Sequence, residues 1–246
     1  MRTAAFFDID GTLYRESLMI EHFKKLLKYE VLDEAIWHTQ IKQSYENWRK
    51  RRGNYDDYML GLAEVYVASM KGLERSKMEF ITNQVVDLKG DNVYMYTRNR
   101  IGWHKAQGHA VIFISGSPDY LVRKMAERYA ITDCMGTRYL LDPEDRYTGE
   151  IEQMWDSDSK RGAVDHFVRK FDLDLTSSYA YGDTVGDLSM FELVGNPVAI
   201  NPTRELLTHL KSTPVLRDKV RVAVERKDVV YLLRPDVETF RAYGDE

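Results

Sequence analysis

The chain has 246 residues, 43% hydrophobic and 12% aromatic, which is enough to bury the core of one large domain or of a domain with a subdomain. Its net charge of −4 gives no global basic field, so we expect no nucleic-acid partner, and the single cysteine, Cys134, excludes an intramolecular disulfide. We find no secretory signal pattern and no apolar run near the roughly 20 residues of a membrane span, so we expect a cytoplasmic protein with no membrane partner.

The first predicted element is a buried strand over the apolar run 4–7, followed by the sequence Asp8-Ile9-Asp10-Gly11-Thr12. Gly11 allows a tight turn at the end of this strand. Asp8 and Asp10 then lie on the same side of the strand or around its end, where two carboxylates repel each other. The pair is stable if a cation neutralises it or if one acid keeps its proton. It indicates either a nucleophile with a proton carrier or two solvated acids in a turn.

Residues 14–91 show apolar side chains at helical spacing, which predicts a helical subdomain inserted after the first strand. We interpret the apolar stripes as the core of this subdomain and not as a cofactor site. The stripes are Leu18, Phe23, Leu26 and Leu27; Trp37, Ile41, Tyr45 and Trp48; and Met59, Leu62, Val65 and Tyr66.

The one strong basic run in the sequence is residues 49–52, Arg-Lys-Arg-Arg. We interpret it as the solvated end of a helix in this subdomain. The alternatives are a nucleic-acid or membrane patch, and an arginine that reaches an anionic substrate.

The sequence pattern of residues 92–246 predicts alternating strands and helices, which is typical of an open parallel sheet with helices on both faces. A helix over 92–108 leads back to strands over 110–114 and 179–181. Two hairpins are expected, at 138–151 and 219–233, the second without an assigned function, and residues 242–246 are expected to be frayed. The predicted fold is therefore α/β, a three-layer Rossmann-like core of residues 1–13 and 92–246 with the inserted helical subdomain of residues 14–91.

The turns after the predicted strands carry the candidate chemistry, because ligands of such sheets bind beyond the carboxyl ends of the strands. Ser115 and Gly116 offer a hydroxyl and backbone N–H groups to an anion. Lys160, placed just before a helix over 163–171, can balance the charge of a phosphate and a carboxylate. Asp183 and Asp187 add hard oxygen ligands, a set that suits Mg²⁺.

These motifs, taken in order, resemble the four signatures of the haloacid-dehalogenase-like (HAD) hydrolases. The first is residues 7–13, Phe-Asp-Ile-Asp-Gly-Thr-Leu; the second and third are Ser115 and Lys160; the fourth is residues 182–187, Gly-Asp-Thr-Val-Gly-Asp. The insertion between the first two signatures is similar to the family's C1 cap. With Asn201-Pro202 after the fourth signature, the chain resembles the subfamily IB enzymes that include phosphoserine phosphatases.

The resemblance implies a role for each acid and for the lysine. Asp8 would attack phosphorus and form an aspartyl-phosphate, while Asp10 would protonate the leaving alkoxide and then activate water. Lys160 would stabilise Asp8 and the transferring group. Asp8, the main-chain carbonyl of Asp10 and Asp183 would bind Mg²⁺, with Asp187 bonded to ligands or waters. An acid at the position of Asp10 favours phosphoryl transfer to water over dehalogenation.

The same resemblance implies a substrate site around the transferred phosphoryl group. Ser115 and Gly116 would hold the phosphoryl oxygens, and Arg15 and Glu16, which follow the nucleophile loop, are candidates to contact the leaving group or to pair with charges at the cap's hinge. Ser17 stands where phosphoserine phosphatases usually carry a glutamate, which weakens the case for phosphoserine as the substrate.

We therefore expect a Mg²⁺-dependent phosphatase, a phosphoric monoester hydrolase, acting on a small phosphorylated metabolite. The alternatives are phosphoserine phosphatase proper, a phosphotransferase or mutase, and a regulatory protein that binds a phosphate ligand without turnover. The sequence leaves the oligomeric state open.

Overall fold

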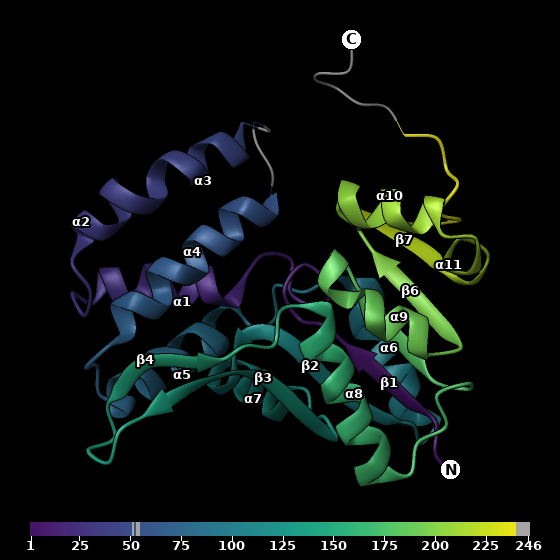
Figure 1. The fold of residues 1–246 in the computed structure, drawn as a ribbon, viewed down its shortest axis with the longest axis horizontal. Coiled ribbons are helices and arrows are strands. Elements are labelled where there is room, and N and C mark those ends of the chain that lie inside the picture. Colours follow the sequence, from purple (N-terminus) through teal and green to yellow (C-terminus); the bar gives the residue numbers. More distant parts are fainter. Residues whose placement is uncertain (51, 53–54, 240–246) are drawn as a thin grey trace.

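The structure, a computed structural model, describes residues 1–50, 52 and 55–239 of the chain. Within them, one eight-stranded sheet has the order β4-β3-β2-β1-β5-β6-β7-β8 (Figure 1). Its strands are β1 (Ala4–Phe7), β2 (Ala110–Pro118), β3 (Asp133–Leu141), β4 (Tyr147–Glu152), β5 (Tyr179–Gly182), β6 (Asn196–Ile200), β7 (Arg221–Arg226) and β8 (Val229–Leu233).

The strands from β3 to β7 in this order pair in parallel, and an antiparallel hairpin strand, β4 or β8, forms each edge of the sheet. Both predicted hairpins are present, and both extend the central sheet. Helices cover both faces, as Figure 1 shows, which gives three layers. The predicted α/β, Rossmann-like class is confirmed.

β1 lies in the middle of the sheet because its residues are apolar on both faces. Ala5 and Phe7 join the core cluster on one face, while Ala4 and Phe6 join the cluster on the other. All four side chains are fully buried. This alternation is the expected geometry of a strand and sets the direction of the side chains that follow at its carboxyl end.

The segment between β1 and α6 (Met95–Ala106) contains helices, as predicted for residues 14–91. The apolar stripes identified in the sequence pack into its interior, with Phe23, Leu26, Leu62 and Tyr66 buried. The helices are α1 (Leu18–Lys28), α2 (Glu34–Ile36), the π-helix η1 (Trp37–Ile41), α3 (Lys42–Arg49), α4 (Tyr55–Met70) and α5 (Arg75–Lys89).

The basic run at the end of α3 is exposed at Arg49, Lys50 and Arg52, as expected for a solvated helix end. Arg51 and the expected fraying of residues 242–246 lie outside the described residues.

The remaining helices connect the strands of the sheet: α6 (Met95–Ala106), α7 (Asp119–Arg128), α8 (Ser157–Phe171), the 3₁₀-helix η2 (Val185–Asp187), α9 (Leu188–Leu193), α10 (Arg204–Ser212) and α11 (Pro214–Lys219). None of the helices in the described ranges combines the length and apolar character needed to cross a bilayer.

Two local predictions were wrong. The helix that carries Lys160 begins at Ser157 and not at Ala163, because the Asp156 carboxylate caps it by accepting a hydrogen bond from the Ser159 N–H. Strand β2 runs on to Pro118, with a shift of register against β3 after Ile114. Ser115 and Gly116 therefore lie within this irregular strand end and not in a turn.

Candidate active site

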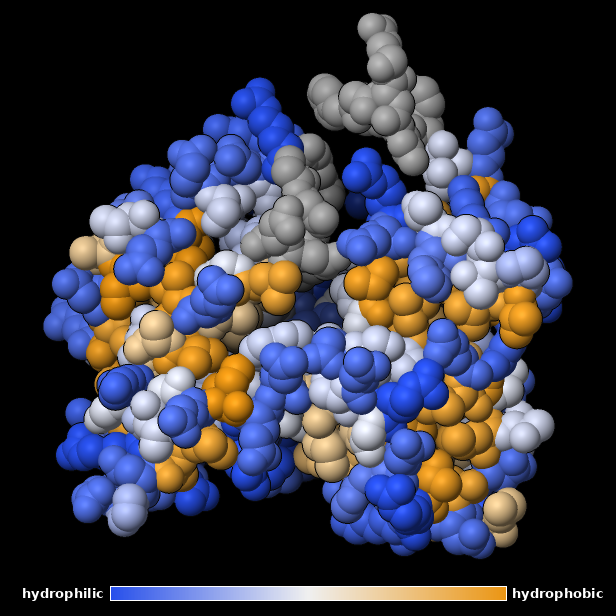
Figure 2. Space-filling view, in the orientation of Figure 1, coloured by the Kyte–Doolittle hydropathy of each residue, from blue (hydrophilic) through white to orange (hydrophobic). Residues whose placement is uncertain are grey.

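A cavity of about 780 Å³ lies at the carboxyl ends of β1, β2 and β5. On one side it is lined by residues of the sheet and the loops that follow it, and on the other by residues of α1 and α4. Figure 2 shows a hollow on this face of the molecule, with apolar surface beside it. The predicted site residues that line it are Asp8, Asp10, Ser115, Gly116, Lys160 and Asp183.

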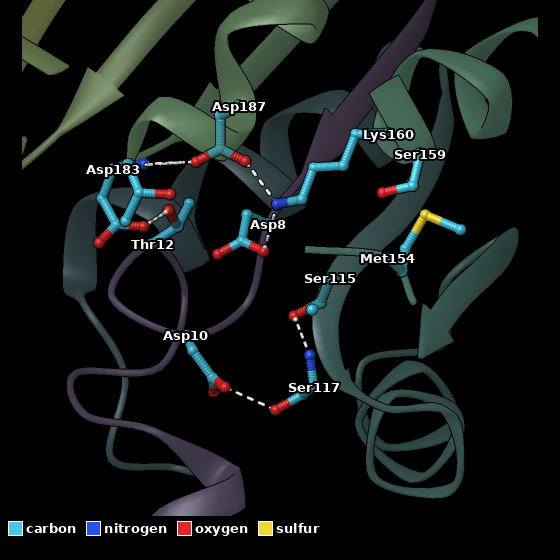
Figure 3. Close-up of polar contacts among 12 residues, drawn as sticks. Asp8, Asp10, Thr12, Ser115, Ser117, Met154, Ser159, Lys160, Asp183 and Asp187 are labelled. Carbon is cyan, nitrogen blue, oxygen red and sulfur yellow. Dashed lines mark hydrogen bonds and ion pairs between the residues drawn. The ribbon is translucent and has the colours of Figure 1, made fainter. Parts of the chain in front are cut away.

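Asp8, Lys160 and Asp187 form a buried charged triplet (Figure 3). The Lys160 ammonium donates to Asp8 Oδ1 at 3.0 Å and to Asp187 Oδ1 at 2.5 Å. Burial lowers the pKa of Lys160, but the two carboxylates outweigh this effect and raise it above its usual value, so the lysine is protonated. Asp187 Oδ2 accepts hydrogen bonds from the N–H groups of Asp183 and Thr184, which fixes this carboxylate in place.

Asp183 is held by the turn that follows Asp10. The Thr12 hydroxyl donates to Asp183 Oδ1 at 2.9 Å. Gly11 has a φ of +77°, and a Cβ at this position would lie 2.1 Å from Asp183 Oδ2. Only glycine therefore fits between the turn and the carboxylate, for reasons of both conformation and space.

The carboxylates of Asp8, Asp183 and Asp187 have oxygens within 4.8 Å of one another. Burial raises the pKa of Asp8 to about 7 against the opposing effect of Lys160, and burial together with Asp8 and Asp187 raises the pKa of Asp183 well above its usual range. Three buried carboxylates share the single ammonium of Lys160, which alone does not neutralise the cluster. A set of buried, under-compensated carboxylate oxygens fits a hard cation such as Mg²⁺.

Asp10 lies apart from this cluster, and its side chain is held by three donors. Its Oδ1 accepts from the Leu18 N–H at 2.9 Å, and its Oδ2 accepts from the hydroxyls of Ser17 at 3.2 Å and Ser117 at 2.5 Å. Burial raises the pKa of Asp10, and these hydrogen bonds oppose the increase. The side chain is thus oriented at the cavity with an increased tendency to carry a proton.

Ser115 and Gly116 line the cavity at the carboxyl end of β2, the strand that pairs with β1. Ser115 is 1% exposed, and its Oγ accepts from the Ser117 N–H at 3.3 Å. A Cβ on Gly116 would lie 2.8 Å from the Cβ of Trp155, so glycine permits close packing at this wall. Both residues therefore border the cavity that Asp8 also lines.

Arg15 and Glu16 are not brought into the cavity, since neither is among its described lining residues. The Arg15 guanidinium instead pairs with Glu225 of β7 at 3.1 Å and donates to the Val93 carbonyl at 3.0 Å. Their assignment to substrate binding gains no support from this geometry.

Sequence reasoning missed the roles of Thr12 and Ser117 as partners of Asp183 and Asp10. Thr12 lies two positions after Asp10, and Ser117 lies two positions after Ser115, both of which the sequence motifs identified. The apolar residues Met19, Met59 and Leu60 were also not recognised as part of the cavity wall, because helical periodicity does not distinguish a core position from one beside a cleft.

Comparison with known proteins finds relatives that are named as phosphatases. The sequence is 27% identical over 207 residues to the probable phosphatase Rv3661 of Mycobacterium tuberculosis, covering 83% of this chain and 71% of the relative. It is 25% identical over 226 residues to the histidinol-phosphatase of Neisseria meningitidis, covering 89% of this chain and all of the relative. Such names agree with the enzyme class expected from the sequence, a phosphoric monoester hydrolase.

The fold is similar to that of a substrate-bound phosphoserine phosphatase, with a TM-score of 0.59 and 19% identity over 93% of this chain and 95% of the other. The profile of the haloacid dehalogenase-like hydrolases matches residues 5–192, which include all four motifs. Because this match spans well over half of the sequence, the chain belongs to the haloacid dehalogenase-like hydrolase family.

Proposed function

We propose that this hydrolase releases phosphate from a small phosphomonoester metabolite with the help of Mg²⁺, through an aspartyl-phosphate on Asp8. The observation that carries the proposal is the buried contact of Asp8 with Lys160, beside two further carboxylates and in a cavity that Ser115 also lines. Together these groups can hold a phosphoryl anion against an anionic nucleophile that would otherwise repel it.

In the first step, an oxygen of Asp8 forms a bond to phosphorus while the bond from phosphorus to the leaving oxygen breaks. Lys160 binds Oδ1 of Asp8, and no hydrogen bond from a described residue engages Oδ2, so Oδ2 is the oxygen that attacks. The Ser115 hydroxyl and the Gly116 N–H bind the phosphoryl oxygens. Asp8, Asp183 and the Asp10 carbonyl would hold Mg²⁺, which when bound would supply positive charge that offsets the charge of the phosphoryl group.

Asp10 transfers the protons. Its carboxyl group donates a proton to the leaving oxygen in the first step and accepts one from water in the second, when water attacks phosphorus and frees Asp8. The increased pKa of Asp10 and its orientation by Ser17 and Ser117 support this role.

We further propose that residues 14–91 act as a cap over a core of residues 1–13 and 92–246. Support comes from α1 and α4, whose residues form the wall of the cavity that faces the carboxylates. A wall of this kind excludes water while the acyl phosphate forms and limits the substrate to a small molecule.

The proposal predicts that phosphate release from phenyl phosphate requires Mg²⁺ and vanishes in Asp8→Asn, which keeps the shape of the side chain but removes the anionic nucleophile. Asp172→Asn is the matched control, because Asp172 is exposed and has a φ of +51° that asparagine tolerates. Colorimetric phosphate assays with and without a chelator measure both effects. Retained activity in Asp8→Asn, with Asp172→Asn also active, would contradict the aspartyl-phosphate.

A further inference from the structure

The wall of the cavity that α1 and α4 form is apolar. It is formed by Met19 of α1 and by Met59, Leu60 and Ala63 of α4. Leu60 is half exposed, so its side chain lies at the opening and not in the core. A leaving group that projects from the phosphoryl group bound at Asp8 toward the helices meets this wall.

Lys160 is the single basic side chain among the described residues that line the cavity. Its ammonium is already shared between Asp8 and Asp187. Arg15, the nearest basic residue in sequence to the nucleophile loop, is paired with Glu225 outside the cavity. The described lining therefore has no free cation that could pair with a second anionic group of the substrate and compensate for the loss of its hydration.

Acidic side chains also lie on the core side of the cavity, at Asp156 and Glu205. Hydrogen bonds from Ser159 hold the pKa of Asp156 below its usual value, so this carboxylate is ionised at neutral pH. A carboxylate on the leaving group would approach like charges there and an apolar surface on the opposite side.

We propose that the natural leaving group bears no carboxylate or second phosphate and lays an apolar face against Met19, Met59 and Leu60. This inference rests on the proposed phosphatase function and narrows its substrate class. It excludes phosphorylated amino acids and sugar bisphosphates, and it favours phosphate esters of alcohols with an aromatic or aliphatic body.

The test compares phenyl phosphate with 4-carboxyphenyl phosphate, which differ by one remote carboxylate on the leaving group. Since an unpaired, desolvated carboxylate is costly to bind, kcat/KM for the carboxylated ester is expected to be lower by about tenfold or more. Equal values, or a preference for the carboxylated ester, would overturn the inference.

Leu60→Lys places a cation at the opening of the cavity, at a position exposed enough to accept it. This variant is expected to reduce the discrimination several-fold by raising kcat/KM for 4-carboxyphenyl phosphate. Leu88→Lys, on the exposed surface of α5 and outside the described lining of the cavity, is the matched control and should leave the ratio unchanged. An unchanged ratio in Leu60→Lys would show that the leaving group does not lie against α4.

Failure of the proposed function is recognised separately, as the absence of phosphate release from both esters. In that case, calorimetric titration with phenylphosphonate and 4-carboxyphenylphosphonate in the presence of Mg²⁺ still decides the inference. Tighter binding of the uncarboxylated compound by about tenfold supports it, and equal affinities overturn it.

Discussion

At the scale of single residues, the site depends on groups that fix the carboxylates as much as on the carboxylates themselves. Asp187 accepts from Lys160 and from two backbone N–H groups, so it orients the lysine and the turn at Asp183. The hydroxyls of Ser17 and Ser117 both donate to Asp10 Oδ2 and orient the Asp10 carboxylate. These hydrogen bonds keep the buried carboxylates in a fixed orientation, and such bonds are strong in a site of low dielectric constant.

Gly11→Ala is predicted to reduce kcat by about 100-fold, because the added Cβ displaces the Asp183 carboxylate from its place beside Thr12. The positive φ of Gly11 adds a conformational cost of about 1–2 kcal/mol. Steady-state kinetics and thermal unfolding measure the two effects separately.

Gly108→Ala is the matched control, since Gly108 has a φ of +72° and open space where an added Cβ would lie. It should lower stability by a similar conformational cost and leave kcat unchanged. If both variants lost activity equally, the contact with Asp183 would not be the cause.

At the scale of elements, a buried polar network ties the inserted helices to the core. The Tyr66 hydroxyl of α4 lies 2.8 Å from His22 Nδ1 of α1 and 2.7 Å from the Tyr120 hydroxyl of α7. The other ring nitrogen of His22 faces Thr82 of α5 at 3.3 Å and the Met78 carbonyl at 3.5 Å. The hydrogen bond between Tyr66 and Tyr120 thus joins the proposed cap to α7 of the core, and His22 links Tyr66 to α5 within the cap.

Burial lowers the pKa of His22 to about 3, below the ordinary value of about 6.5 expected in the unfolded chain. Below pH 6.5 the unfolded chain therefore binds a proton that the folded protein excludes, and stability falls as the pH falls. From pH 7.5 to 5.5 this effect lowers the free energy of unfolding by about 1.4 kcal/mol, and in His22→Gln we expect the decrease to be smaller by this amount.

Urea denaturation of both proteins at the two pH values tests this prediction. His209→Gln, on α10 and outside the network, is the control and should keep the wild-type pH dependence. Identical pH dependence in wild type and His22→Gln would show that His22 is not held neutral by the fold.

At the scale of the whole molecule, the hairpin of β7 and β8 contacts two segments that are distant in sequence. These are the residues after the nucleophile loop and the start of α6, the helix that follows the inserted segment. The side chain of Glu225 in β7 is 3% exposed and accepts from the N–H groups of Met95 and Tyr96, at the start of α6. It also binds Arg15, which follows the loop of Asp8 and Asp10. This contact gives the hairpin a structural role that the sequence left unassigned.

Glu225→Ala is predicted to lower the free energy of unfolding by about 1–3 kcal/mol, because it removes the side-chain acceptor of the Met95 and Tyr96 N–H groups and the ion pair with Arg15. Glu127→Ala, which removes an exposed carboxylate from α7, should change it by less than about 0.5 kcal/mol. Denaturant unfolding measures both values, and equal small effects would contradict this role of the hairpin.

The sequence by itself determined the fold class, the central strands and the motif residues, because apolar runs and their polar ends are local features. β1 has the predicted bounds, 4–7, and Asp8, Lys160, Asp183 and Asp187 come together as strand topology requires. The start of α8 was missed because it depends on the Asp156 cap, and the extent of β2 because it depends on pairing with β3.

Only the tertiary structure decided which side chains share the cavity and which are engaged elsewhere. Arg15 and Glu225 are 210 residues apart, so no local pattern links them, yet they form an ion pair, and Arg15 is not among the described residues that line the cavity. The apolar wall of Met19 and Met59 likewise arises where two helices meet the sheet. Local sequence motifs indicate the reaction class, whereas the shape and charge of the substrate site depend on packing between residues that are distant in sequence.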